Sequence, residues 1–123
     1  MDSTFDAATV AALAAVDEIA IEVPRADGRA PAVPIWVVVA DGEVYARSAR
    51  GGHGRWYRAL LAHPDATICV NDRRIPVRGI RVEDAAVIGK VDAAYQAKYG
   101  GSPYLPPLFE EESRRCTVCL VPR

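Results

Sequence analysis

The sequence predicts a mainly β fold in which an antiparallel sheet closes into a barrel, with helices packed against the outside. Short segments rich in β-branched residues recur along the chain, separated by turn signals. Asp41-Gly42 stands between two of them, as in a tight hairpin. The expected helices are too few to cover a parallel sheet. After a short N-terminal helix, the predicted order is β-β-β-α-β-β-α-β.

The composition is that of one ordinary globular domain. With 123 residues the chain can form one real core but not two, so we expect residues 1–123 to be a single domain. Half of the residues are apolar, a quarter are charged and the net charge is −1. A nearly neutral protein has no general attraction for a polyanion, so we expect no nucleic-acid partner.

No segment suggests export or membrane insertion. Asp2 and Asp6 stand where a signal peptide would carry Lys or Arg, and no run approaches the roughly 20 apolar residues that span a bilayer. We therefore expect a cytoplasmic protein with no membrane partner. In that reducing compartment the three cysteines, Cys69, Cys116 and Cys119, are expected to stay free.

The first half of the chain predicts a helix followed by three consecutive strands. Residues 18–23 alternate polar and apolar side chains, whereas residues 32–40 are nearly all apolar and β-branched. A turn over 26–29 joins these two segments. The expected elements are a helix over 6–15 and strands over 18–23, 32–40 and 43–48.

The second half predicts two longer helices and three further strands. Asp84 is placed to cap the second helix, which Gly100 ends. A tight turn over 72–74 joins the first two of these strands, and a Pro-rich loop follows Gly100. The expected elements are helices over 55–63 and 84–100, strands over 66–71, 75–83 and 116–122, and an acidic helical turn over 109–115.

The segment RSARGGHGRWYR (47–58) has the groups that a monophosphate site needs. A glycine-rich loop before a helix exposes backbone N–H groups at the helix N-terminus, where an anion is favoured. Ser48 offers a hydroxyl, and Arg50 and Arg55 offer forked donors for phosphate oxygens. Two other interpretations remain open: a solvated loop, the simpler one from the residues alone, and a nucleic-acid contact. The segment has no Gly-Lys-Ser/Thr and is not a Walker P-loop.

Two runs, PIWVVVADGEVYARS (34–48) and RWYRALLAHPDATICV (55–70), resemble the central signature of the flavin-binding split β-barrel superfamily. This superfamily includes the pyridoxamine-phosphate oxidases and the deazaflavin-dependent nitroreductases. The nitroreductase-like branch is the closer match, together with a small uncharacterised family related to it. Two positions depart from the nitroreductase pattern, which usually has Asn at Ala59 and His63. The resemblance implies an antiparallel split β-barrel.

The resemblance also implies a homodimer with a flavin, FMN or deazaflavin, bound at the interface. Arg47, Ser48, Arg50 and Arg55 would hold its phosphate, while the backbone around residues 35–37 (Ile35, Trp36 and Val37) would line the ring. Trp56 could also contact the ring, although periodicity places Trp56 or Tyr57, or both, in the core.

Tyr95, Lys98 and Tyr99 form a second group of interest, together with Tyr104 beyond the glycines. Tyr95 and Tyr99 are four residues apart on one helical face, which is more often core or interface than active site. In a pocket, a phenol could donate to a substrate carbonyl and Lys98 could hold an acidic group.

Other catalytic and metal-binding patterns are missing from the sequence. Cys116 and Cys119 are three residues apart on an expected strand, so their side chains should point to opposite faces. No metal is expected, and no residue is identified as catalytic. The leading hypothesis is an oxidoreductase-like protein that transfers a hydride between its cofactor and a small organic acceptor. The alternative is a ligand-binding split barrel that has lost flavin redox turnover.

Overall fold

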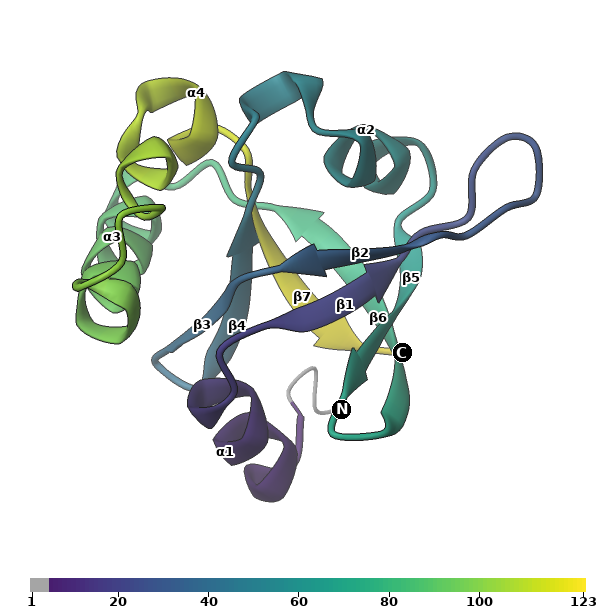
Figure 1. Ribbon diagram of the computed structural model, residues 1–123, viewed down its shortest axis with the longest axis horizontal. Helices are drawn as coiled ribbons and strands as arrows, with labels where there is room; N and C mark the ends of the chain where they lie inside the picture. The colour runs from purple at the N-terminus through teal and green to yellow at the C-terminus, as the bar shows by residue number, and fades with distance from the viewer. Residues whose placement is uncertain (1–4) are drawn as a thin grey trace.

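The computed structural model describes residues 5–123 and shows a curled antiparallel sheet with helices around it (Figure 1). All strand pairings are antiparallel, so the predicted fold class is confirmed. The strands of the described chain are β1 (Ile19–Glu22), β2 (Ala32–Ile35), β3 (Val37–Ala40), β4 (Glu43–Arg47), β5 (Asp65–Val70), β6 (Arg73–Arg81) and β7 (Thr117–Pro122).

The first and third helices begin after residues whose side chains cap them. Asp6 accepts a hydrogen bond from the backbone N–H of Thr9 at 2.7 Å, and Asp84 accepts one from that of Ala86 at 2.8 Å. The helices are α1 (Ala7–Ala15), α2 (Arg55–Ala62), α3 (Ala85–Tyr99) and α4 (Glu111–Arg114), with two 3₁₀ turns, η1 (Gly51–His53) and η2 (Pro106–Phe109).

The prediction of one continuous strand over 32–40 is wrong, because Trp36 divides this segment into β2 and β3. The strand order is β2-β1-β5-β6-β7-β4-β3, so β2 and β3 are the two edges of the sheet. They are nevertheless joined by Trp36 alone. The bend lets one chain segment pair with β1 on one side and with β4 on the other, and this brings the two edges of the curled sheet together (Figure 1).

Hairpin turns connect β3 to β4 and β5 to β6. Asp41 and Gly42 both have positive φ, as predicted for the first turn. The second prediction, a turn over 72–74, is corrected: Asn71 (φ 47°) and Asp72 (φ 66°) form the turn, and Arg73 already pairs with Val70. Two consecutive left-handed residues make a two-residue turn that matches the strand twist, and Asn and Asp tolerate that conformation.

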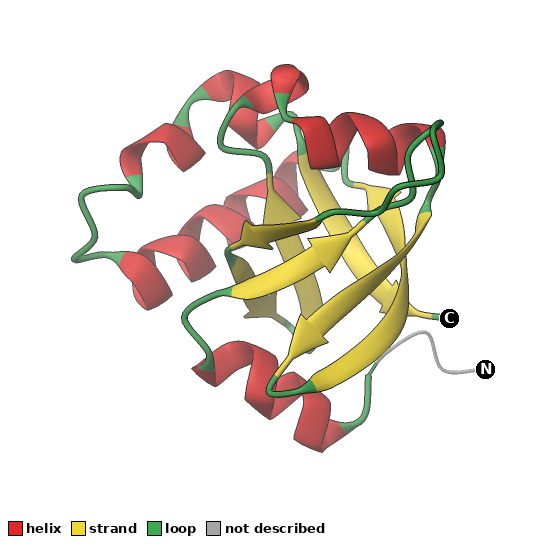
Figure 2. Ribbon diagram, turned by 45° about the vertical axis from the view of Figure 1, so that its right-hand side comes forward, coloured by secondary structure: helices red, strands yellow, loops and turns green. Residues whose placement is uncertain are grey.

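Two apolar cores lie on opposite sides of the sheet (Figure 2). The larger fills the barrel and contains Ile35 and Val37, whereas Trp36 packs with the smaller core beneath α3. Trp36 therefore faces away from its two neighbours. Cys116 and Cys119 likewise belong to different cores, as their spacing predicted.

Polar groups of α3 hold the bend at Trp36 in place. The Tyr95 hydroxyl donates to the Trp36 carbonyl at 2.7 Å, and Lys98 Nζ donates to the carbonyls of Leu13 and Val37. The Tyr99 hydroxyl donates to the Asp17 carbonyl at 2.7 Å. Tyr95 and Tyr99 are both buried. The interpretation of these tyrosines as core residues is confirmed, and the bend is fixed from outside the barrel.

Candidate functional site

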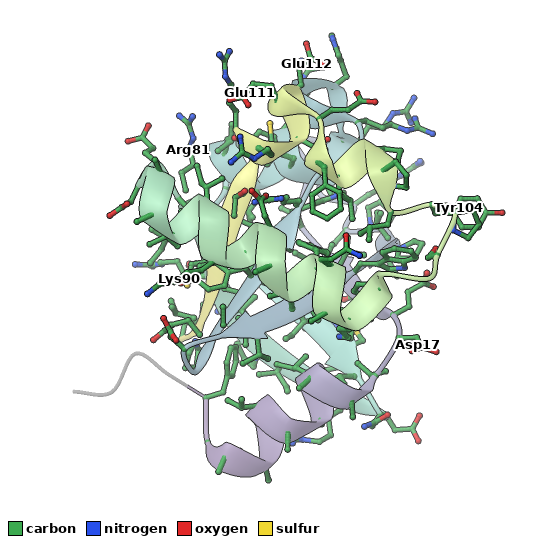
Figure 3. All side chains as sticks on the ribbon, turned by 90° about the vertical axis from the view of Figure 1, so that its left-hand side faces the viewer. Asp17, Arg81, Lys90, Tyr104, Glu111 and Glu112 are labelled. Carbon is green, nitrogen blue, oxygen red and sulfur yellow. The ribbon has the colours of Figure 1, made fainter. Side chains whose placement is uncertain are left out.

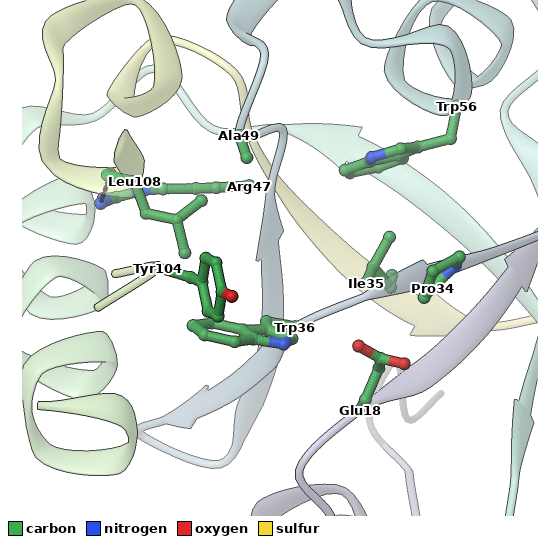
Figure 4. A pocket seen from close by; sticks show the side chains of 9 residues that line it. All are labelled: Glu18, Pro34, Ile35, Trp36, Arg47, Ala49, Trp56, Tyr104 and Leu108. Carbon is green, nitrogen blue, oxygen red and sulfur yellow. Dashed lines mark hydrogen bonds between the residues drawn. The ribbon is translucent and has the colours of Figure 1, made fainter. Parts of the chain in front are cut away.

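Two adjoining cavities form a cleft between the bend at Trp36 and the N-terminal end of α2. The aromatic cavity has a volume of about 320 Å³ and is shown in Figure 4, where its nine lining residues are labelled. The arginine cavity has a volume of about 340 Å³ and is lined by Arg25, Arg50 and Arg55 among others. Both cavities include Pro34, Ala49 and Trp56, so they are two ends of one cleft.

Three aromatic side chains surround the aromatic cavity. Trp36 is held flat because its ring stacks on Tyr99, with centroids 4.1 Å apart and planes 8° from parallel. Tyr104 lies beside Trp36, and Trp56 lies across the cavity from them (Figure 4). The Tyr104 side chain, on the loop after α3, projects outward and is 75% exposed (Figure 3). A flat ligand could therefore contact aromatic surface on two sides.

The arginine cavity brings together three guanidinium groups from separate parts of the chain. Arg25 comes from the loop between β1 and β2, where its backbone bonds with Arg29 and Gly28 fix a turn. Arg50 precedes η1, and Arg55 is the first residue of α2. The ion pairs of residues 5–123 all involve other basic residues. The three charges are thus available to an anion.

The loop before α2 is tightly built. The buried Ser48 hydroxyl donates to the Gly51 carbonyl at 2.7 Å, and Gly54 packs against that hydroxyl. Gly51 has φ 58° and packs closely on Glu112, so a side chain there would be strained and crowded. Gly54 is the N-cap of α2 and provides no side-chain cap. The first-turn N–H groups of α2 therefore have no capping side chain, and Gly54, Arg55 and Trp56 at this end of the helix line the arginine cavity.

Arg47 and Ser48, both predicted to hold phosphate, are buried. The Arg47 guanidinium donates to Thr117 Oγ1 at 2.8 Å, to Asp92 Oδ1 at 2.6 Å and to the carbonyls of Leu108 and Ile88. Arg47 lines the aromatic cavity but its charge is balanced by Asp92. Ser48 lines the arginine cavity with its hydroxyl directed to the loop. Both residues shape the cleft.

The residues predicted to line the ring are divided by the bend. Ile35, Trp36 and Trp56 all line the aromatic cavity. Val37 is fully buried in the barrel core, and its carbonyl accepts from Lys98 and Tyr99. Of the four predicted phosphate residues, Arg50 and Arg55 are exposed at the arginine cavity.

Sequence reasoning missed Arg25 and Glu18, and it grouped Tyr104 with Tyr95, Lys98 and Tyr99 rather than with the loop at 47–58. Arg25, Glu18 and Tyr104 all line the cleft. Each comes from a segment distant in sequence from the loop at 47–58, so no local pattern links them to it. One feature of the sequence does indicate that Tyr104 is exposed. It lies in the Pro- and Gly-rich segment 100–107, where no strand or helix is expected to bury an aromatic side chain.

The groups near the cleft whose pKa values are shifted are the α3 side chains that hold the bend at Trp36 in place. Burial raises the pKa of Tyr95 and of Tyr99 above the ordinary value, and Asp17 and Glu18 add to the shift at Tyr99. Burial lowers the pKa of Lys98. These groups hydrogen-bond to backbone carbonyls, and none of the three lines the aromatic cavity.

Two searches of residues 5–123 gave negative results. No cluster of three or more His, Cys, Asp or Glu side chains in that part of the chain could hold a metal ion. None of its helices is both long and apolar enough to cross a membrane.

Comparison with solved structures confirms the expected split β-barrel fold class, which pyridoxamine-phosphate-oxidase-like proteins share. A conserved hypothetical protein from Mycobacterium tuberculosis is 15% identical with a TM-score of 0.66, over 98% of this chain and 81% of that one. An F420-H2-dependent reductase is 19% identical with a TM-score of 0.63, over 85% and 93%. The heme storage protein HutZ from Vibrio cholerae is 15% identical with a TM-score of 0.64, over 87% and 80%. At these identities the likeness establishes the fold alone.

Within this class the chain belongs to a particular family. Residues 9–120 match the family of uncharacterised proteins conserved in bacteria called DUF2255, and the chain is a member of it. No curated protein matches the sequence significantly.

Proposed function

We propose that this protein binds a phosphorylated flavin or deazaflavin in the cleft and transfers a hydride between that cofactor and a small organic acceptor. The observation that carries the proposal is the division of one cleft into an aromatic end and an arginine end. A phosphorylated flavin has the same two parts, because a short polar chain joins its aromatic ring to an anionic phosphate.

The arginine cavity supports phosphate binding by three kinds of donor. Arg25, Arg50 and Arg55 provide charge, and the first turn of α2 provides backbone N–H groups and the positive end of a helix dipole. Ser48 and Gly54 fix the loop, so little ordering is needed when a ligand binds. The donor set therefore fits a phosphate dianion.

The aromatic cavity supports the ring end. Trp36 and Tyr104 on one side and Trp56 on the other offer surfaces for stacking, and Ile35 closes the space between them. A flavin or deazaflavin supplies the hydride chemistry when bound. The protein orients the ring and keeps one side open to an acceptor, with Glu18 as the acidic residue at that end of the cleft.

We propose a homodimer in which a partner subunit covers the open side of the cleft. Tyr104 is 75% exposed at that opening, which is unusual for an aromatic side chain that contacts only its own subunit. Sedimentation analysis should give twice the mass of the chain; a monomer at micromolar concentration would remove this part of the proposal.

The alternative is a ligand-binding barrel without redox turnover, and the likeness to a heme storage protein favours heme as its ligand. Among the residues that line the aromatic cavity, Tyr104 is the one whose side chain is a common axial ligand of heme iron. Titration with heme, followed by its Soret absorption, distinguishes the two functions. A Soret shift that Tyr104→Phe abolishes supports the alternative.

The proposal is tested by binding the ring with and without its phosphate. Quenching of ring fluorescence should show tighter binding of FMN than riboflavin, and of deazaflavin phosphate than the unphosphorylated deazaflavin. Deazaflavin supplied in its reduced form should then pass a hydride to a nitroaromatic acceptor and become oxidised. A colourless protein that binds none of these ligands would contradict the proposal.

A further inference from the structure

Glu18 gives the aromatic end of the cleft an acidic group. It directly precedes β1, whose first residue, Ile19, pairs with Ile35. Continuing this register by one residue places Glu18 across from Trp36 at the bend. Because Ile19 and Ile35 are both buried in the barrel, these two adjoining residues face the outer side of the sheet. Figure 4 shows the Glu18 carboxylate directed toward the cavity beside Trp36.

The charge of the Glu18 carboxylate is not balanced by a neighbour. Glu18 takes part in none of the ion pairs of residues 5–123. The other charged side chain that lines the aromatic cavity is Arg47, which is fully buried and paired with Asp92. The aromatic end is therefore negative, whereas three arginines make the other end of the cleft positive. The charge of the cleft thus reverses along its length.

The aromatic walls beside Glu18 can also stabilise a positive charge. The face of an indole or phenol ring attracts a cation. Trp36 is held flat by its stack on Tyr99, and Tyr104 lies beside it. A planar cation whose charge is delocalised over a ring could stack on these walls and contact the carboxylate at its edge. Flat walls and an unpaired carboxylate in one cavity therefore favour this class of ligand.

We propose that Glu18 selects the acceptor, and that the acceptor is a planar, delocalised cation such as an N-alkylated heteroaromatic ring. This inference rests on the proposed function and names its substrate class. Hydride from the reduced, monoanionic cofactor forms a C–H bond at a carbon conjugated with the positive nitrogen, and a π electron pair moves to that nitrogen. The acceptor is reduced to a neutral product, the cofactor is oxidised, and no proton is consumed. The product has lost the charge that Glu18 attracts, which favours its release.

Two probes of the same shape test this inference by binding. They are the N-methylquinolinium cation and its neutral isostere, methylnaphthalene. Equilibrium dialysis against protein saturated with the oxidised cofactor, FMN or deazaflavin phosphate, measures both affinities without turnover. The cation should bind about fivefold more tightly, as expected for an exposed ion pair, and added salt should reduce this preference. Glu18→Gln should abolish the preference and leave the affinity for methylnaphthalene within about twofold.

Turnover is the second readout. With reduced deazaflavin, the unaltered protein should convert the cation to the neutral dihydroquinoline, followed by the absorption of the oxidised cofactor. Glu18→Gln should raise KM for the cation by about fivefold and leave kcat unchanged, because the carboxylate attracts the acceptor and takes no part in hydride transfer.

Asp17→Asn is the matched control, since it removes the same charge from the neighbouring residue, which lines neither end of the cleft. It should keep the preference for the cation. The inference is overturned by equal affinities in the unaltered protein, by a preference that survives in Glu18→Gln, by an equal loss in Asp17→Asn, or by binding of the cation without its reduction. Each of these results leaves the cofactor site intact. If the protein binds neither cofactor, the proposed function fails together with the inference.

Discussion

Arg47 has different surroundings from Arg50 and Arg55, although all three lie within nine residues of sequence. The Arg47 side chain is buried, pairs with Asp92 and donates to three further oxygen atoms. Arg50 and Arg55 are exposed at the arginine cavity. A buried arginine is needed for the fold, whereas an exposed arginine without an ion pair is available to a ligand.

The largest expected effect is on folding. Arg47→Ala leaves the oxygen atoms of Thr117, Leu108 and Ile88 without this donor, whereas Asp92 keeps its ion pair with Arg114. Because several buried hydrogen bonds are lost together, the free energy of unfolding should fall by about 3 to 5 kcal/mol. Urea unfolding measures this loss. Arg50→Ala is the control and should change stability by less than about 0.5 kcal/mol. Similar stability losses in the two variants would remove the distinction between these arginines.

The second effect is on binding. Arg50→Ala and Arg55→Ala should each weaken a phosphorylated ring ligand by about 1.5 to 3 kcal/mol, the value of a charge-assisted hydrogen bond. The unphosphorylated ring should bind both variants as it binds the unaltered protein. Fluorescence titration gives these affinities. Equal losses with and without the phosphate would show that the two arginines do not contact it.

A smaller effect is expected at the bend. The Tyr95 hydroxyl bridges the Trp36 carbonyl and the Arg47 N–H, so Tyr95→Phe leaves two buried backbone groups with one partner fewer. We expect a loss of about 1 to 2 kcal/mol in stability. Tyr104→Phe, which alters an exposed hydroxyl, serves as the matched control and should have no effect. A Tyr95→Phe protein as stable as the control would argue against a role of this hydroxyl in the bend.

The smallest effect is a dependence on alkaline pH. Burial raises the pKa of Tyr95 above its ordinary value of 10.0, so the folded state favours the neutral phenol. This stabilisation is complete below the unfolded pKa and is lost as the pH rises toward the folded pKa. The melting temperature should therefore fall above pH 10, and less steeply in Tyr95→Phe. An identical slope in that variant would mean that other groups control the alkaline transition.

The elements of the fold could be predicted because their signals are local. Asp6 and Asp84 cap helices where the sequence places them, and Asp41-Gly42 makes the expected turn. The division of 32–40 at Trp36 could not be predicted, since it depends on pairing with β1 and β4 and on polar groups of α3.

The candidate site was predictable only in part for the same reason. The glycine loop and the start of α2 identify Arg50 and Arg55 locally. The side chains that accept hydrogen bonds from Arg47 lie 45 and 70 residues further along the chain, at Asp92 and Thr117. Arg25 reaches the arginine cavity from the loop between β1 and β2, which carries no anion-binding pattern of its own.

The most direct test of the account compares the affinity for a phosphorylated ring with that for the same ring without phosphate, in the unaltered protein and in the double variant Arg50→Ala/Arg55→Ala. The account predicts a strong preference for the phosphorylated ring that the double variant loses, with the folded state retained. No preference in the unaltered protein, or the same preference in the double variant, would contradict it.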